Sequence, residues 1–430
     1  MKIFSFLSPK VLLVAGAVVL TLVCVLIAVN FMSGEKKIER RIERLYSLED
    51  PRFRNELGVL LGPAFVGGNR HTALRNGDEI FPAMLAAIRD ARTSITFETY
   101  IYWSGDIGRE FAEALADQSR QGVKVHVLLD WVGSAKVDDQ LLEVMGAAGV
   151  QIKKFHPPHW SNLGRLNNRT NRKILVVDGR IAFTGGVGIA PLWTGNAQDP
   201  DHWRDTHFQI EGSVVAQIQA VFLDNWIKVT GVLLNGPDYF PELAPAGNAL
   251  AQMFSSSPSG GSESMQLMYL LAITAASRSI DLAAAYFVPD ELTLQALVEA
   301  LKRGVKLRIV VPDEHMDSET VRSASRARWG PLLSAGAVIA EYRPTMFHCK
   351  VMIVDGLLVS VGSTNFDNRS FRLNDEATLN IIDADFAKAQ TAIFEEDLSR
   401  SRQLTYAQWR ERPLRERLGE RIASFFGSQL

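Results

Sequence analysis

Four polar residues in the second half of the chain have the side chains that phosphoryl transfer requires: His348, Lys350, Ser363 and Asn365. An imidazole can act as a nucleophile or as a general acid. A lysine together with hydroxyl and amide donors can stabilise the negative charge that concentrates on the oxygens of a pentacovalent phosphorus. A lone His-x-Lys on a strand is common, so the case depends on how these residues are brought together.

The four residues flank a sequence that predicts a β-hairpin. Asp355-Gly356 separates two apolar, β-branched runs, which is the strongest short-range hairpin signal. With a two-residue turn, His348 would lie directly opposite Ser363. Because side chains alternate along a strand, Lys350 and Asn365 would point to the same face as His348. We therefore expect the four polar groups to converge at the open end of the hairpin.

The same pattern recurs in the first half with one change. Lys173 follows Asn171 at the His-x-Lys spacing, and Asp178-Gly179 separates two further apolar runs, the second of which ends near Gly186. Asn171 thus stands where His348 stands in the second copy. Two such hairpins would rarely arise by chance in one chain, so we interpret them as a functional repeat.

Each hairpin follows a predicted strand–helix–strand unit. The matching segments are residues 94–102, 108–120 and 121–130 in the first half, and 279–287, 291–302 and 303–312 in the second. Gly122 and Gly304 end the two helices at equivalent places. The pattern predicts an α/β fold with two pseudo-twofold-related α/β/α domains, mixed sheets, and matching edges face to face.

The twin His-x-Lys-x4-Asp pattern resembles the signature of the phospholipase D superfamily. The second copy matches it fully, and the first matches it except at Asn171. Further stretches are similar to bacterial cardiolipin synthases: residues 97–102, 203–207, 225–226, 286–289 and 363–370. The resemblance spans roughly residues 60 to 400. It is specific for the superfamily and less so for the substrate, because nucleases and lipases share the motif.

The resemblance implies a reaction that needs neither metal nor cofactor. In the family, one histidine forms a covalent phosphohistidine while the other protonates the leaving alcohol and then activates the incoming one. A cardiolipin synthase passes a phosphatidyl group from one phosphatidylglycerol to a second and releases glycerol. Carried over, Asn171 occupies the position of the nucleophile and His348 that of the acid/base.

The resemblance also assigns supporting roles. Lys173 and Lys350 would clamp the phosphate, Glu376 would orient His348, and Asp205 would play the matching part beside residue 171. The motif aspartates Asp178 and Asp355 are counted with the catalytic set. The substrate-binding candidates are Ser363, Asn365 and Gly186.

Asn171 predicts an impaired enzyme, because a carboxamide has no basic lone pair with which to form a stable phosphoryl adduct. Loss of a covalent nucleophile costs several orders of magnitude in rate. Either the asparagine was introduced to give an inactive, substrate-retaining form, or it is natural and the chain is a lipid-binding pseudoenzyme. Retention of Lys173, His348, Lys350 and Glu376 favours an introduced change.

The N-terminus predicts a membrane anchor. Residues 11–29 are almost all apolar, and about 20 such residues span a bilayer. No small-x-small cleavage site follows, so an uncleaved single-pass anchor in a bacterial inner membrane is a better interpretation than a signal peptide. The basic residues after it place the body in the cytoplasm. Interleaved glutamates leave the periplasmic side open.

The charge balance weighs against nucleic acid as a partner, because 46 basic and 48 acidic residues give a net charge of −2. The expected partners are phosphatidylglycerol, cardiolipin and the membrane, and a homo-oligomer is compatible with the sequence. Lipid hydrolysis or headgroup exchange of the phospholipase D type is the alternative activity, and a nuclease is a more distant one.

The expected domain organisation follows from these features. The segments are a tail (1–10), a transmembrane helix (11–32), a charged helical linker (33–62), a first domain (63–245), a Ser/Gly-rich linker (246–265), a second domain (266–400) and an amphipathic C-terminal segment (401–430). In the last segment Leu414, Leu418, Ile422 and Phe425 recur at helical spacing among arginines. This predicts either an interfacial helix on anionic lipid or a terminal helix packed on the body with its arginines paired to glutamates.

Overall fold

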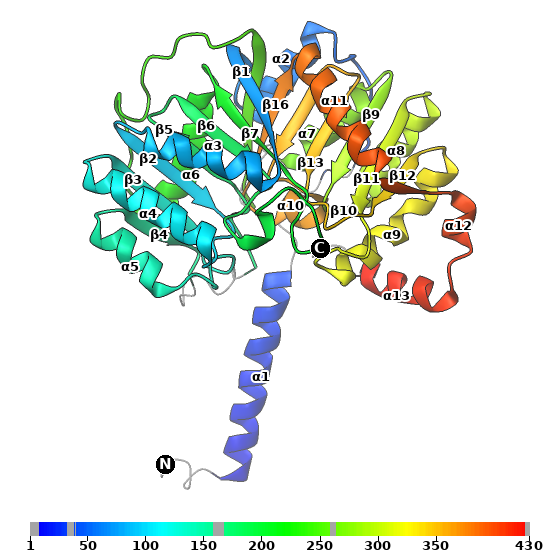
Figure 1. Ribbon diagram of the computed structural model, residues 1–430. Helices are drawn as coiled ribbons and strands as arrows, with labels where there is room; N and C mark the ends of the chain where they lie inside the picture. The colour runs from blue at the N-terminus through cyan, green and yellow to red at the C-terminus, as the bar shows by residue number, and fades with distance from the viewer. Residues whose placement is uncertain (1–7, 32–37, 39, 158–166, 259–263, 426–430) are drawn as a thin grey trace.

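The computed structural model describes residues 8–31, 38, 40–157, 167–258 and 264–425. A mixed sheet with helices on both faces forms the body, and one long N-terminal helix extends away from it (Figure 1). The predicted α/β class and the single apolar N-terminal helix are confirmed within these residues.

The large sheet consists of two sets of strands in the same spatial order. The first set runs β4 (Gln151–Phe155), β3 (Lys124–Asp130), β2 (Ser94–Thr99), β5 (Ile174–Val177), β6 (Ile181–Gly185), β7 (Thr206–Glu211) and β1 (Val66–Arg75). The second runs β12 (Val338–Tyr342), β11 (Lys306–Pro312), β9 (Ser279–Ala284), β13 (Lys350–Val354), β14 (Leu358–Gly362), β16 (Glu376–Ile382) and β8 (Ala249–Ser256), with β17 (Ser401–Leu404) beyond β12. β1 and β8 pair antiparallel where the sets meet. This strand-by-strand correspondence is the predicted pseudo-twofold repeat.

Helices cover both faces of each set, as alternate residues of one strand show. Leu175 and Val177 of β5 pack with one group of helices, while Ile174 and Val176 pack on the opposite side. In the first half the helices are α3 (Asn76–Arg89), α4 (Asp106–Arg120) and α5 (Asp139–Ala147), with α6 (Val215–Thr230) on the other face. In the second half they are α7 (Met265–Ala275), α8 (Glu291–Lys302) and α9 (Glu319–Ser334), with α11 (Ala384–Ser399) on the other face. The apolar core that contains α6 and α11 draws residues from both halves and joins them.

Smaller elements complete the described chain. They are the turn η3 (Pro191–Trp193), the short parallel pair β10 (Phe287–Val288) and β15 (Phe366–Asp367), α10 (Asn368–Arg372), α12 (Tyr406–Arg410) and α13 (Leu414–Phe425).

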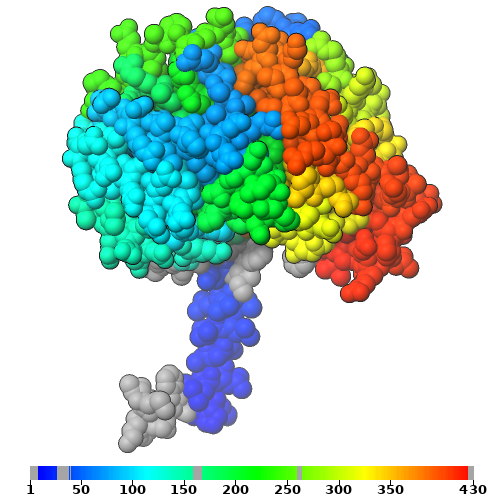
Figure 2. Space-filling view, in the orientation of Figure 1, coloured from blue at the N-terminus to red at the C-terminus, as the bar shows by residue number. Residues whose placement is uncertain are grey.

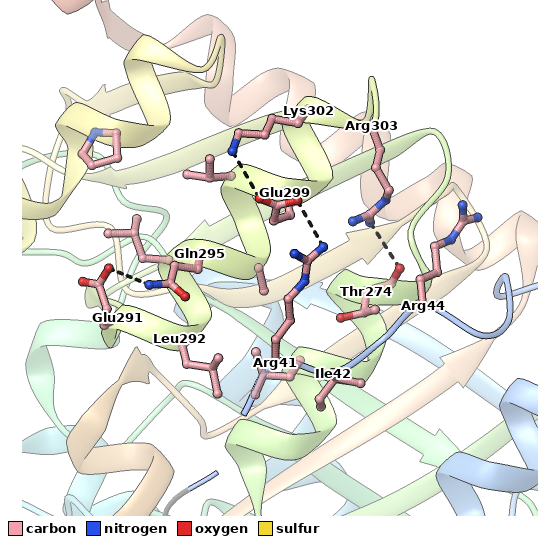
Figure 3. Close-up of a pocket in the computed structure, with 15 residues that line it drawn as sticks. Arg41, Ile42, Arg44, Thr274, Glu291, Leu292, Gln295, Glu299, Lys302 and Arg303 are labelled. Atoms are coloured by element: carbon pink, nitrogen blue, oxygen red, sulfur yellow. Dashed lines mark hydrogen bonds and ion pairs between the residues drawn. The ribbon is translucent and has the colours of Figure 1, made fainter. Parts of the chain in front are cut away.

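The segment after the anchor differs from the prediction. α1 (Pro9–Phe31) is long and apolar enough to cross a membrane. Among the described residues of the predicted helical linker, only α2 (Pro51–Leu61) is helical, and residues 41–47 are not. Arg41 pairs at 3.1 Å with Glu299 of α8, which lies far away in the sequence. The two lie beside a cavity of about 340 Å³ between this segment, α7 and α8 (Figure 3). Contacts with the body thus replace the local charge pairs that the helix prediction assumed.

The Ser/Gly-rich linker is also shorter than predicted. Residues 249–256 form β8, which pairs with β16 and with β1. Met253 and Phe254 are buried in different cores, as alternation across a sheet requires. The serines at residues 255 and 256 led the prediction to assign the end of this strand to the linker. Residues 259–263, the tail to residue 7 and residues 426–430 lie outside the described residues, and the domain boundaries stay a prediction.

Candidate active site

The two motif hairpins form as expected, but with a longer turn. Val354 pairs with Leu358, so three residues instead of two separate the strands, and the first hairpin has the same register. Asp355 and Gly356 both have positive φ, 54° and 62°, which Asp-Gly tolerates. A one-residue shift turns every side chain to the other face. The prediction that His348 lies directly opposite Ser363 is therefore wrong.

The motif aspartates lie at the turn end of the hairpins, not at the site. Asp178 accepts hydrogen bonds from the backbone N–H groups of Arg92, Thr93 and Ser94, which lead into β2. Asp355 does the same in the second half, at the residues that lead into β9. Both fix the hairpin against the strand beside it. Asp178 and Asp355, which were predicted as part of the catalytic set, therefore have a structural role.

Residues 171 and 348 lie where the two halves meet. The backbone N–H of Asn171 donates to the carbonyl oxygen of Asp375 at 2.9 Å, and that of His348 donates to the carbonyl oxygen of Arg204 at 2.8 Å. Each of these two residues therefore hydrogen-bonds to the other half, at the residue just before Glu376 or Asp205.

The two carboxylates consequently serve the opposite half. Asp205 Oδ2 accepts from Nδ1 of His348 at 2.8 Å. Both oxygens of Glu376 accept from Nδ2 of Asn171, at 3.0 and 3.2 Å. The predicted partners, Glu376 for His348 and Asp205 for residue 171, are exchanged. The reason is geometric, because the starts of β7 and β16 face across the pseudo-twofold axis and not back along their own hairpins.

Ser363 and Gly186 support these carboxylates. The hydroxyl of Ser363 donates to Glu376, and its carbonyl oxygen accepts from Asn171 at 3.0 Å. A Cβ on Gly186 would stand 2.4 and 2.5 Å from the oxygens of Asp205, so only glycine leaves room for that carboxylate. The third substrate-binding candidate, Asn365, has a buried Oδ1 that has no hydrogen-bond partner among the described residues. It keeps the capacity to bind a ligand.

The two lysines stand beside the reactive positions. Nζ of Lys173 donates to Oδ1 of Asn171 at 2.7 Å, and Nζ of Lys350 lies 3.3 Å from both ring nitrogens of His348. Burial, with the charge of Lys350 nearby, lowers the pKa of Lys173 to about 7. Burial likewise raises the pKa of Glu376 to about 7, although Lys173 opposes the shift. The buried lysines can thus take up charge when an anion arrives.

His348 is set up for proton transfer. Burial and then the charge of Lys350 lower its pKa, while Asp205 opposes the shift. Nδ1 donates to Asp205 in both the neutral and the protonated imidazole, so Nε2 is the atom that exchanges a proton. The rings of Trp193 and Trp203 lie 5.3 Å from the imidazole and confine it. This geometry suits a general acid/base.

Sequence reasoning missed two buried arginines that join the halves. Arg172 pairs with Asp224 at 3.0 Å and lies 3.7 Å from Asp375, while Arg204 binds both oxygens of Asp397 at 2.9 and 2.8 Å. The available signal was alternation, since Arg172 stands between two inward residues of the motif and must point to the other face of its strand.

The fold and the site define a phospholipase D-type α/β protein in which each half completes the site of the other. A family model described as "Cardiolipin synthase, PLD-like domain" matches residues 84–224 and 269–398. The cardiolipin synthase of Geobacillus kaustophilus is 36% identical over 388 residues, which cover 89% of this chain and 77% of that protein. Cardiolipin synthase A of Pseudomonas fluorescens is 34% identical over 359 residues, covering 83% and 74%. The chain belongs to the phospholipase D-like cardiolipin synthase family.

A solved structure shows the same fold at low identity. The phosphatidylserine synthase of Haemophilus influenzae matches with a TM-score of 0.68 at 13% identity, over 88% of this chain and 100% of that chain. The fold thus recurs at an identity of only 13%.

Proposed function

We propose that this chain is a cardiolipin synthase-type phosphatidyltransferase that is arrested at its first chemical step by Asn171. The observation that carries the proposal is the crossed site. Asn171 is held by Glu376 where an imidazole would be oriented, and His348 is held by Asp205 in the matching position. The relatives named cardiolipin synthase support the substrate class.

The proposed reaction with a histidine at position 171 has two steps. In the first, Nε2 of that histidine attacks the phosphorus of a phosphatidylglycerol. The bond from phosphorus to the glycerol headgroup oxygen breaks, and the imidazolium form of His348 donates its Nε2 proton to the leaving glycerol and becomes neutral. In the second, His348 takes the proton from a hydroxyl of a second phosphatidylglycerol, whose oxygen attacks the phosphohistidine. The P–N bond breaks and cardiolipin forms. Lys173 and Lys350 neutralise the phosphoryl oxygens in both steps.

Asn171 blocks the first step in two ways. Its amide nitrogen has no basic lone pair and already donates to Glu376 and to the carbonyl oxygen of Ser363. Its Oδ1 accepts from Lys173 at 2.7 Å, which ties up one of the two phosphate-binding cations. We therefore infer an activity lower by several orders of magnitude than that of a histidine form. The intact surroundings support an introduced change over a natural pseudoenzyme.

We also propose the location of the reaction. α1 would be a single-pass anchor in a bacterial inner membrane, with the body on the cytoplasmic side because of the basic residues that follow α1. Access of reagents to body residues in intact inverted and right-side-out vesicles would decide the side.

The function is tested by mass spectrometry of lipids after incubation with phosphatidylglycerol vesicles. The proteins are the present chain, Asn171→His, and Asn171→His combined with His348→Ala. We expect cardiolipin and free glycerol in equal amounts from Asn171→His alone. Phosphatidic acid in place of cardiolipin would favour phospholipase D-type hydrolysis, and no product from any form would reject the assignment.

A further inference from the structure

The last helix, α13, has two faces of opposite character. On one face Glu420 and Ala423 are 4% and 7% exposed. Glu420 pairs with Arg412 at 2.5 Å and lies 3.6 Å from Arg326 of α9. The alternative of a terminal helix packed on the body is therefore confirmed for this face.

The opposite face of α13 is apolar and uncovered within the described part of the chain. Leu414, Leu418 and Ile422 are 79%, 62% and 57% exposed. Their spacing of four residues puts them on one stripe, about half a turn from Ala423. Three large aliphatic side chains at successive turns of one helix form a continuous exposed stripe, which soluble surfaces seldom carry without a partner.

Positive charge borders the stripe. Arg415, Arg417 and Arg421 are all exposed, and at 100° per residue they fall on its two flanks. A helix that is apolar along one line, with arginines beside it, has the composition of helices that lie in the surface of an anionic bilayer. A second copy of the chain is a poorer fit, because an isologous contact between two such stripes would bring their arginines together.

The position of α13 agrees with a membrane. In Figure 1 α13 lies at the lower edge of the body, at the level where α1 leaves it, and runs across the direction of α1. Figure 2 shows the C-terminal segment as a projection from the body at this same end. The described side chains of α1 up to Val25 are all exposed, and the helix is long and apolar enough to cross a bilayer. The two elements can therefore meet one membrane.

We propose that α13 is an interfacial helix that inserts the stripe Leu414, Leu418 and Ile422 into the anionic membrane surface beside the anchor. A body held by one helix alone can turn and tilt on it. A second contact with the membrane fixes the orientation of the body relative to the bilayer. α10 and β10, which adjoin the site, lie on the side of the body from which α1 extends (Figure 1), so the fixed pose turns the site towards the lipid.

The test places a fluorophore on the stripe of the full-length protein in vesicles. Leu418→Cys is made in a Cys24→Ser background, where the remaining Cys349 is buried and unreactive. The matched control is Val59→Cys on α2. Val59 is 83% exposed, and in Figure 1 α2 lies at the other end of the body from α1. Each labelled protein is exposed to a quencher attached to shallow lipid positions and, separately, to aqueous iodide.

We expect the label at residue 418 to be quenched by the lipid probe and shielded from iodide, and the label at residue 59 to show the reverse. The lipid quenching should fall when phosphatidylglycerol is replaced by neutral lipid. If residue 418 behaves like residue 59, the stripe is free in solution and the proposal is wrong. Shielding from iodide without lipid quenching would mean that a second protein surface covers the stripe, which also overturns it. The measurement needs no catalysis, so its result is independent of the proposed function.

Discussion

The crossed pairing of carboxylates makes a specific prediction for Asp205→Asn in the Asn171→His form. The carboxylate of Asp205 accepts three hydrogen bonds, one at Oδ1 and two at Oδ2. Its Oδ1 accepts from the backbone N–H of Thr206 at 2.8 Å, and its Oδ2 accepts from Trp193 Nε1 at 3.1 Å and His348 Nδ1 at 2.8 Å. An amide in either orientation sets its NH₂ group against at least one of these donors.

The size of the effect follows from what the carboxylate does for His348. Losing a hydrogen bond to a charged group costs about 1.5–3 kcal/mol, which is about 10- to 150-fold in rate at 1.36 kcal/mol per tenfold. An amide that donates to Nδ1 also selects the wrong tautomer of the imidazole, and in a serine protease this loss reaches about 10⁴-fold. We therefore expect cardiolipin synthesis to fall by about 10²- to 10⁴-fold.

The assay separates the two carboxylates by using a phosphodiester with a p-nitrophenyl leaving group. This phenolate leaves without being protonated, so formation of the phosphohistidine does not need His348. Asp205→Asn should keep the burst of p-nitrophenolate and lose the turnover that follows. Glu376→Gln, the matched control on residue 171, should lose the burst. The opposite pattern, with the burst lost in Asp205→Asn and kept in Glu376→Gln, would refute the crossed assignment.

Three further predictions concern charge and packing. Gly186→Ala should reduce the activity of the histidine form as strongly as a change at Asp205, because the new Cβ would displace that carboxylate. Gly146→Ala in α5, where nothing lies within 4 Å of the added Cβ, is the matched control in the same activity assay. Arg172→Met should destabilise the fold by about 1–3 kcal/mol, measured by denaturant unfolding, because it removes the buried hydrogen bonds to the carbonyl oxygen of Val221 and to Asp224. Asp375 keeps Lys228 as a partner at 3.2 Å. Binding of a non-hydrolysable phosphodiester to the present chain should weaken above pH 7, by up to about tenfold per pH unit. The pKa of Lys173 is about 7 in the free site and must rise when an anion binds, so binding takes up a proton. Calorimetry in buffers of different ionisation enthalpy measures that proton uptake.

Much of the fold could be predicted because it repeats. The helix expected at residues 291–302 is observed as α8 over the same residues, and both Asp-Gly turns form. These signals are local, since apolar periodicity, a glycine after a helix and an Asp-Gly pair act over a few residues. The convergence of Lys173 and Lys350 on one site followed from the repeat.

The parts that failed depend on contacts between distant segments. The offsets of Asp205 and Glu376 from their own hairpins suggested partners in the same half, whereas the pairing is decided by how two halves dock. The hairpin register depended on one extra turn residue that no local signal marks. Residues 41–47 were expected to be helical, but this segment instead contacts residues far away in the sequence, such as Glu299, which pairs with Arg41.

The most direct test of the account is to identify the residue that carries the phosphoryl group. The Asn171→His form combined with His348→Ala is mixed with the p-nitrophenyl phosphodiester, quenched at a pH that preserves phosphohistidine, and digested for peptide mass spectrometry. The account predicts the adduct on the peptide that contains residue 171, and no adduct in the present chain. An adduct on His348 in the present chain, or none at residue 171 when the histidine is restored, would contradict it.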